Sequence, residues 1–285
     1  MTGINSGWVL AGGVRTHYSW AGTDGPAVVL LHGGGPGSSG WAGWRHTMGP
    51  LADAGYRVLA PDQLSMGRTD AREHAWPVNG HQSLVEHIAD FVDALCLDTV
   101  HLAGNSQGAY VAAKFALDHP ERADRLVLIG TATVAEAMGL PWPRKETNPG
   151  LLALRDYDYT RPAMRRFLEA IVDDPGKVTD EVLDLRHEMA NLPGIRESRA
   201  AFDAYRLRMQ DSPKLAGRFS LAASLPAAGF PLRLVWGAKD RFAPIEMGEE
   251  LAARLDLDLT VLDAGHQAQT DQPELVNRIL TDHFK

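Results

Sequence analysis

The stretch Leu102-Ala103-Gly104-Asn105-Ser106-Gln107-Gly108 decides the fold, because it places a Gly-x-Ser-x-Gly motif between an apolar run and an Ala-rich segment. Residues 99–103 predict a buried strand and residues 109–117 predict a helix. A sharp turn between the two strains the backbone of the serine, and Gly104 and Gly108 leave room for neighbouring backbone. The motif alone is weak, and a purely structural Gly-rich turn is the alternative. Its setting favours a nucleophile elbow that exposes Ser106.

A serine is a poor nucleophile unless a base takes its proton and an acid orients that base. Asp240 follows one late predicted strand, and His266 follows the next on a Gly-His loop. Their order along the chain predicts a catalytic triad of Ser106, Asp240 and His266. A solvated loop carboxylate and a surface histidine are the alternatives. Asp263 is a rival acid, but its closeness to His266 in the sequence makes orienting the imidazole awkward.

Acyl transfer also needs donors for the oxygen that becomes negative on the attacked carbonyl. Residues 27–31 predict a buried strand that runs into His32-Gly33-Gly34-Gly35-Pro36-Gly37, a loop with bare backbone N–H groups. We expect an oxyanion hole made by the N–H groups of Gly34 and Gln107. His32 ends a strand and is expected to be structural. A phosphate cradle is disfavoured, because no Lys-Ser/Thr pair follows the glycines.

Strands alternate with helices along most of the chain, which predicts a mostly parallel sheet covered by helices on both faces. The predicted strands are 7–10, 13–20, 27–33, 56–61, 99–103, 124–130, 231–237 and 257–262, and the predicted helices outside the lid are 41–54, 82–96, 109–117 and one at the C-terminus. Between 134 and 222 only helical spacing with proline punctuation is found. The sequence therefore predicts an α/β core of residues 1–133 and 223–285, with a helical lid of residues 134–222 inserted between two strands.

Four segments resemble the α/β-hydrolases and, within them, the meta-cleavage-product hydrolases, which cut carbon-carbon bonds in ring-fission products of aromatic degradation. These segments are His32-Gly33-Gly34-Gly35-Pro36-Gly37-Ser38-Ser39-Gly40-Trp41, Gly104-Asn105-Ser106-Gln107-Gly108, Trp236-Gly237-Ala238-Lys239-Asp240-Arg241-Phe242 and Gly265-His266. The resemblance runs over nearly the whole chain, and the asparagine before the nucleophile is its most specific mark. It implies an α/β-hydrolase fold with an inserted lid.

The resemblance also implies a set of substrate-binding residues. Arg186 matches a lid-helix arginine that binds the substrate's carboxylate, and its planar fork suits that role. A solvated ion pair on the helix surface is the alternative. Asn105 is expected to hold the same oxygen-rich end, and Gly35 and Gln267 complete the set. The chain departs from the family at Gln267, where a tryptophan is usual, and at Gln107, where a bulky apolar residue is usual, so the substrate's distal group is left open.

The implied activity is cofactor-independent hydrolysis of a vinylogous diketone of the 2-hydroxy-6-oxo-dienoate type. A dienol is first ketonised with His266 as proton carrier, and the new ketone is then attacked by Ser106 or by an activated water. An esterase or lactonase on the same triad is the nearest alternative, favoured by Gln267 and Gln107. A proline iminopeptidase matches the loop glycines less well. A ligand receptor built on a hydrolase scaffold is the alternative outside enzymes.

Composition narrows the classes of partner. The 285 residues are 45% hydrophobic, enough for one substantial core. A formal charge of −8 disfavours nucleic acid and anionic membranes, and no targeting or spanning segment is found, which predicts a cytoplasmic protein.

The single cysteine, Cys96, is expected in the core and excludes a disulfide within the chain. The sequence has no Cys/His cluster with the spacing of zinc ligands and no nucleotide-binding motif, so we expect no metal and no cofactor. The expected partner is a small molecule, and a homo-oligomer is left open.

Overall fold

The computed structural model describes residues 2–285 and is built on an eight-stranded sheet in the order β1-β2-β4-β3-β5-β6-β7-β8. The strands are β1 (Asn5–Ala11), β2 (Val14–Ala21), β3 (Ala27–Leu31), β4 (Arg57–Pro61), β5 (Val100–Asn105), β6 (Ala123–Ile129), β7 (Leu232–Gly237) and β8 (Leu259–Leu262). The hairpin of β1 and β2 is antiparallel, as is the pairing of β2 with β4. All other pairs are parallel. The predicted α/β fold with a mostly parallel sheet is confirmed.

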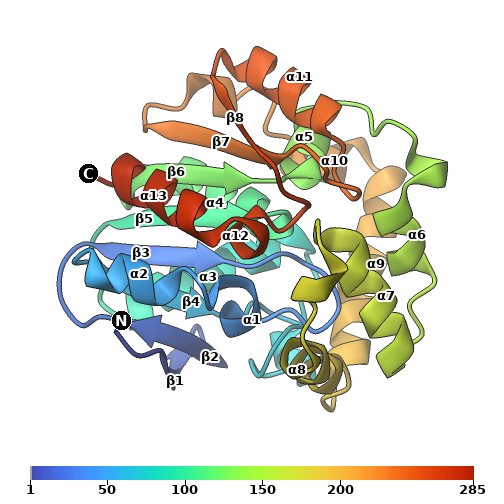
Figure 1. The fold of residues 1–285 in the computed structure, drawn as a ribbon, viewed down its shortest axis with the longest axis horizontal. Helices are drawn as coiled ribbons and strands as arrows, with labels where there is room; N and C mark the ends of the chain where they lie inside the picture. The colour runs from blue at the N-terminus through green and yellow to red at the C-terminus, as the bar shows by residue number, and fades with distance from the viewer. Residues whose placement is uncertain (1) are drawn as a thin grey trace.

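Helices cover both faces of the sheet, because β3 and β5 are mainly apolar and are buried along their whole length. One face packs on α1 (Gly40–Trp44), α2 (Met48–Asp53), α12 (Ala268–Asp271) and α13 (Pro273–His283). The other face packs on α3 (His81–Ala94), α4 (Gln107–Asp118) and α11 (Ile245–Leu255). Figure 1 shows α12 and α13 in front of the sheet, with α3 and α4 behind it. Packing between these two helical layers fixes the carboxyl ends of β3, β5, β7 and β8, and the expected site residues follow these strand ends.

Two local expectations were wrong. The helix expected over 41–54 is two helices, α1 and α2, because Pro50 lacks an N–H group and is tolerated only in the first turn of a helix. Cys96 is exposed and lies outside the core. The helix α3 ends at Ala94, and the chain then turns through a φ of 53° at Cys96, which directs its side chain away from the helix's buried face.

Between β6 and β7 the chain forms only helices and turns, all within the described residues. The helices are α5 (Ala132–Ala137), α6 (Pro149–Arg155), α7 (Arg161–Ile171), α8 (Asp180–Ala190), α9 (Ile195–Gln210) and α10 (Pro213–Phe219). Prolines stand in the first turns of α6, α7 and α10, and each of these helices has an Asn, Thr or Ser N-cap, as proline punctuation predicts. Figure 1 shows α6, α7, α8 and α9 beside the carboxyl ends of the parallel strands. By contrast, α5 packs on α4 and α11 of the core.

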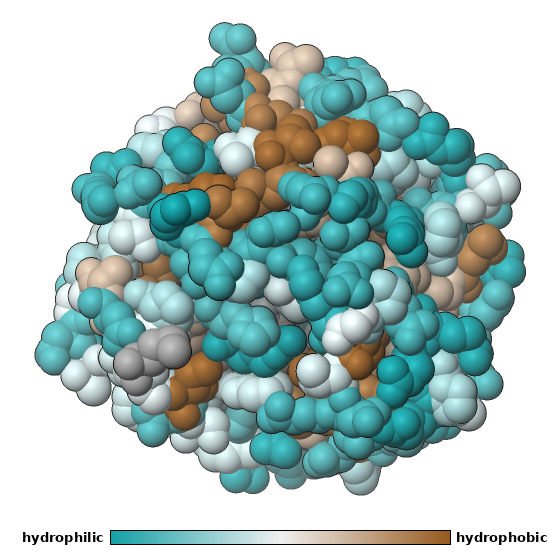
Figure 2. Space-filling view, viewed as in Figure 1, coloured by the Kyte–Doolittle hydropathy of each residue, from teal (hydrophilic) through white to brown (hydrophobic). Residues whose placement is uncertain are grey.

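The surface is mainly polar on the face seen in Figure 2, and its largest hydrophobic patch lies at the top, where Figure 1 places α11 and the edge of the sheet at β8. Among the helices formed by residues 2–285, none combines the length and the hydrophobicity that crossing a membrane requires.

Candidate active site

Ser106 occupies a strained turn between β5 and α4, with φ 56° and ψ −122°. For a residue with a side chain this backbone costs about 1–3 kcal/mol, so the surrounding structure must hold it. Thr131 Oγ1 donates to Ser106 O over 3.0 Å. A Cβ atom on Gly104 would lie 2.4 Å from Gly108 O, and one on Gly108 would lie 2.3 Å from Leu31 O. The steric role predicted for both glycines is therefore confirmed.

His266 and Asp240 form a buried pair at the ends of β8 and β7. The Nδ1 atom of His266 donates to Asp240 Oδ2 over 2.8 Å. The other oxygen, Oδ1, accepts from the backbone N–H groups of residues 242 and 243 over 2.8 and 2.7 Å. With Nδ1 held in this way, Nε2 is the nitrogen left to act as a base. Asp263, the rival acid, is mostly exposed and pairs with Lys239 over 2.7 Å instead.

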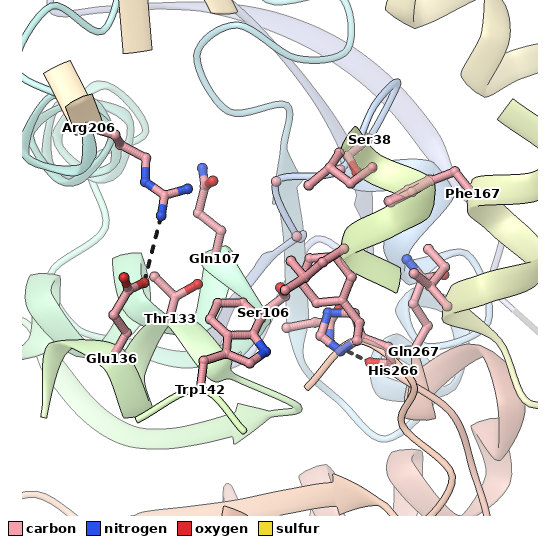
Figure 3. A pocket seen from close by; sticks show the side chains of 18 of the residues that line it. Ser38, Ser106, Gln107, Thr133, Glu136, Trp142, Phe167, Arg206, His266 and Gln267 are labelled. Atoms are coloured by element: carbon pink, nitrogen blue, oxygen red, sulfur yellow. Dashed lines mark hydrogen bonds and ion pairs between the residues drawn. The ribbon is translucent and has the colours of Figure 1, made fainter. Parts of the chain in front are cut away.

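Ser106 and His266 line one cavity of about 230 Å³ (Figure 3). The Ser106 hydroxyl makes no hydrogen bond within residues 2–285. Contacts between a nucleophile and its base are often long without substrate and shorten when it binds. The structure thus brings Ser106 and His266 to one cavity, and Asp240 orients the histidine from outside it through Nδ1.

Free backbone donors face the serine from two sides. Neither the N–H of Gly34 nor that of Gln107, the first residue of α4, donates a hydrogen bond within the described chain. The N-terminus of a helix also carries partial positive charge. A Cβ atom on Gly34 would lie 2.1 Å from Gln107 Oε1, so a side chain there would displace the Gln107 amide. His32 is structural, as expected: its Nδ1 donates to Gly33 O over 2.9 Å, its Nε2 accepts from Gln63 N over 3.1 Å, and burial lowers its pKa.

Arg186 is buried at 2% exposure, so the solvated ion pair considered from the sequence is wrong. Its Nε and Nη2 atoms donate to Pro36 O over 3.1 and 2.7 Å, and Nη2 also donates to Ser38 Oγ over 2.9 Å. No acid of residues 2–285 forms an ion pair with it, and burial lowers its pKa to about 10. A Cβ atom on Gly35 would lie 2.6 Å from Phe167 Cζ and 3.2 Å from Arg186 Nη2. Gly35 thus lets the ring of Phe167 and the guanidinium of Arg186 pack closely against the loop.

Asn105 and Gln267 line the cavity, but their hydrogen bonds support its walls. Asn105 Nδ2 donates to His266 O over 2.9 Å and to Ile129 O over 3.1 Å. Its amide donors therefore anchor the loop of the base, and only Oδ1 remains for a ligand. The backbone N–H of Gln267 donates to Ile171 O over 3.2 Å, which joins the His266 loop to the end of α7.

Asp271 is a supporting residue that the sequence reasoning missed. Its Oδ2 accepts from Gly265 N over 2.7 Å and from Asp173 N over 2.9 Å, so one carboxylate ties the His266 loop to the segment after α7. Burial raises the pKa of this carboxyl group. Only its place just before the C-terminal helix could have indicated it, because no motif contains it. Within residues 2–285, no group of three or more His, Cys, Asp or Glu side chains is arranged to hold a metal ion.

Sequence comparison finds a match to the model of the Alpha/beta hydrolase family over residues 28–279. The chain is 32% identical over 280 residues to the 2-hydroxy-6-oxononadienedioate/2-hydroxy-6-oxononatrienedioate hydrolase of Paraburkholderia xenovorans (strain LB400), covering 95% of this chain and 91% of that protein. It is 35% identical over 291 residues to the 2-hydroxy-6-oxo-2,4-heptadienoate hydrolase of Pseudomonas putida, covering 99% and 98%.

Solved structures of hydrolases also resemble this chain over nearly its whole length. The 2-hydroxy-6-oxo-6-phenylhexa-2,4-dienoate hydrolase of Rhodococcus sp. strain RHA1 superposes with a TM-score of 0.84 at 27% identity, covering 100% of this chain and 99% of that one. A meta-cleavage product hydrolase from Pseudomonas fluorescens IP01 superposes with a TM-score of 0.78 at 30% identity, covering 99% and 97%.

Proposed function

Because this chain belongs to the alpha/beta hydrolase family, we propose that it hydrolyses a carbon-carbon bond in a 2-hydroxy-6-oxo-dienoate, a vinylogous diketone. The observation that carries the proposal is a single cavity that holds Ser106 beside a buried, unpaired arginine, Arg186. The relatives named above, which act on substrates of this type, cover nearly the whole chain at about a third identity.

The reaction needs two stages, because carbon is a poor leaving group. In the first, the dienol becomes a ketone, with His266 carrying the proton of the 2-hydroxyl group to C5, one of the two carbons of the C5–C6 bond that will break. In the second, Ser106 attacks the carbonyl on the far side of that bond while His266 takes its proton. The N–H groups of Gly34 and Gln107 stabilise the oxyanion. The bond then breaks toward the new ketone, which accepts the electron pair, and water releases the carboxylic acid. An activated water in place of Ser106 is the alternative nucleophile.

Asp240 and Arg186 support these steps by charge. Asp240 fixes the tautomer of His266 and stabilises its imidazolium form. A carboxylate carried into a covered site costs several kcal/mol unless a cation meets it. Arg186 supplies that cation, and the N–H groups that Pro36 and Ser38 leave free are available to bind the substrate's carboxylate.

The helices between β6 and β7 serve in this proposal as a lid of residues 134–222 over a core of residues 1–133 and 223–285. Cytoplasmic location and self-association remain expectations, to be tested by cell fractionation and by size-exclusion chromatography with light scattering.

The test is turnover of 2-hydroxy-6-oxo-2,4-heptadienoate, followed by the loss of its absorbance and the release of acetate. We expect turnover by the wild-type protein and loss of turnover in Ser106→Ala. Hydrolysis of p-nitrophenyl esters without any turnover of dienoates would replace the proposal with an esterase or lactonase, which the polar Gln267 and Gln107 favour. Tight dienoate binding without turnover of either substrate would indicate a receptor.

A further inference from the structure

The cavity extends to both sides of Ser106. Figure 3 shows Ser38 and Phe167 on one side, where Arg186 also lies, and Gln107, Arg206 and Glu136 on the other. The second side is called the distal arm here, and its residues are Gln107, Thr133, Glu136, Trp142, Arg199 and Arg206.

Two buried donors in the distal arm have no acceptor within residues 2–285: Gln107 Nε2 and Trp142 Nε1. Gln107 is 8% exposed, and in Figure 3 its amide extends toward the guanidinium of Arg206. Buried donors are almost always paired, because leaving one unpaired costs about 1–3 kcal/mol. A bound group with acceptor oxygens would pair them.

Cations outnumber acids in this arm. Arg206 donates no hydrogen bond in the described chain, and its ion pair with Glu136, at 3.7 Å, is too long to be one. Arg199 Nη1 donates to Gly34 O over 2.9 Å, and Nε donates to Asp203 Oδ2, outside the cavity, over 3.4 Å. Glu136 is thus the one acid among the residues that line the arm, against two arginines. The free donors and the positive charge both favour an anion.

We propose that the distal arm binds a second carboxylate at the far end of the substrate, so that the preferred substrate is a dianion with one carboxylate on Arg186 and the other beside Arg206. This inference rests on the proposed function. An apolar distal group such as phenyl would cover Gln107 Nε2 and the Arg206 guanidinium without pairing either, which selects against it.

The experiment compares three dienoates that differ only in the distal group: 2-hydroxy-6-oxononadienedioate, 2-hydroxy-6-oxo-2,4-heptadienoate and 2-hydroxy-6-oxo-6-phenylhexa-2,4-dienoate. We expect kcat/KM of the wild-type protein to be about tenfold higher for the dioate than for the phenyl compound. Arg206→Gln should raise KM for the dioate about tenfold with little change in kcat, because the contact is a charge-assisted one away from the reacting atoms. For the heptadienoate, kcat/KM should stay within about twofold.

Two further variants sharpen the comparison. Glu136→Gln removes the competing negative charge and should raise kcat/KM for the dioate about threefold, with no effect on the heptadienoate. Arg208→Gln, on the same helix but outside the cavity, is the matched control and should change neither substrate.

Equal kcat/KM for all three dienoates, or equal losses on all three in Arg206→Gln, would overturn the distal carboxylate site while leaving the proposed function intact. Failure of the wild-type protein to hydrolyse any dienoate would overturn both. Thermal melts of each variant establish that the compared proteins are folded.

Discussion

The substitution Arg186→Met separates substrate recognition from support of the active-site loop. Methionine keeps most of the length of the arginine side chain but removes its charge and its N–H donors. In the folded protein this guanidinium is buried, and burial lowers its pKa from 12.5 to about 10. At about 1.4 kcal/mol per pH unit, keeping the charge in place costs about 3 kcal/mol. Removing that cost offsets only part of the three lost hydrogen bonds to Pro36 and Ser38, each of which has a charged donor and is worth about 1.5–3 kcal/mol. We expect the free energy of unfolding to fall by about 2 kcal/mol or more.

Catalysis should respond differently for the two kinds of substrate. A hydrogen bond to a charged group is worth about 1.5–3 kcal/mol, so losing the contact between Arg186 and the dienoate carboxylate should lower kcat/KM roughly a hundredfold. A neutral p-nitrophenyl ester brings no carboxylate, and its hydrolysis depends only on the triad and the oxyanion hole. Its kcat/KM should therefore stay within about threefold of wild type.

The assay measures both substrates on Arg186→Met and on a control, Arg196→Met. Arg196 is exposed on α9, bonds to Asn191 in the same group of helices, and lies outside the cavity, so the control should leave both activities unchanged. Equal losses on dienoate and ester would show that Arg186 acts by holding the loop of residues 33–38. No loss on either would refute its role at the site altogether.

Four other outcomes are expected. Ser106→Ala should lower kcat by about 10⁴-fold or more without changing the circular dichroism spectrum, and retention of a tenth of wild-type turnover would remove it as the nucleophile. Asp240→Asn should cost about 10³–10⁴-fold in kcat, because an amide no longer holds His266 in the required tautomer; a loss below tenfold would contradict that role. Dialysis against a chelator should leave kcat unchanged, and recovery of lost activity by an added metal would contradict the proposed chemistry. His87 is buried against Thr16 Oγ1, and burial lowers its pKa from 6.5 to about 4. Above pH 6.5 the imidazole is neutral in both the folded and the unfolded state, whereas between pH 6.5 and 4 only the unfolded chain takes up the proton, and up to about 3 kcal/mol of stability is lost. His87→Gln should reduce this loss of stability with falling pH, measured by urea titrations, and an unchanged dependence on pH would refute the argument.

The triad was predictable because its chemistry restricts the residue types, their order and their places at strand ends. A serine in a Gly-x-Ser-x-Gly turn needs a later acid and a later histidine, and Asp240 and His266 each follow a late strand. The rival acid, Asp263, lies too close to His266 in the sequence to orient the imidazole easily. The steric roles of Gly104 and Gly108 followed from the same turn. The covered, mostly parallel sheet was predictable too, since apolar strands that alternate with helices leave few other arrangements.

Features that depend on which side chains meet were not predictable. Nothing in the sequence shows that the amide of Asn105 holds the backbone of His266, or that Asp271 joins that loop to the end of α7. Arg186 was expected at the site only through the family resemblance, because its acidic neighbours in the sequence also suit a solvated helix surface. Its burial depends on the loop at residues 33–38, about 150 residues away. Cys96 was misplaced for the opposite reason: its neighbours are apolar, but the helix ends before it.

Two arginines at opposite ends of the cavity should have different kinetic effects, although they carry the same charge. When the carbon-carbon bond breaks, the electron pair moves toward the ketone next to the substrate's first carboxylate, at the end held by Arg186. Negative charge therefore grows beside Arg186 in the transition state, and an interaction that strengthens there raises kcat. At the distal carboxylate the charge does not change during the reaction, so Arg206 binds substrate and transition state equally well and should influence KM alone. A lower kcat in Arg186→Met together with a higher KM in Arg206→Gln would place the breaking bond nearer to Arg186 and orient the substrate within the cavity.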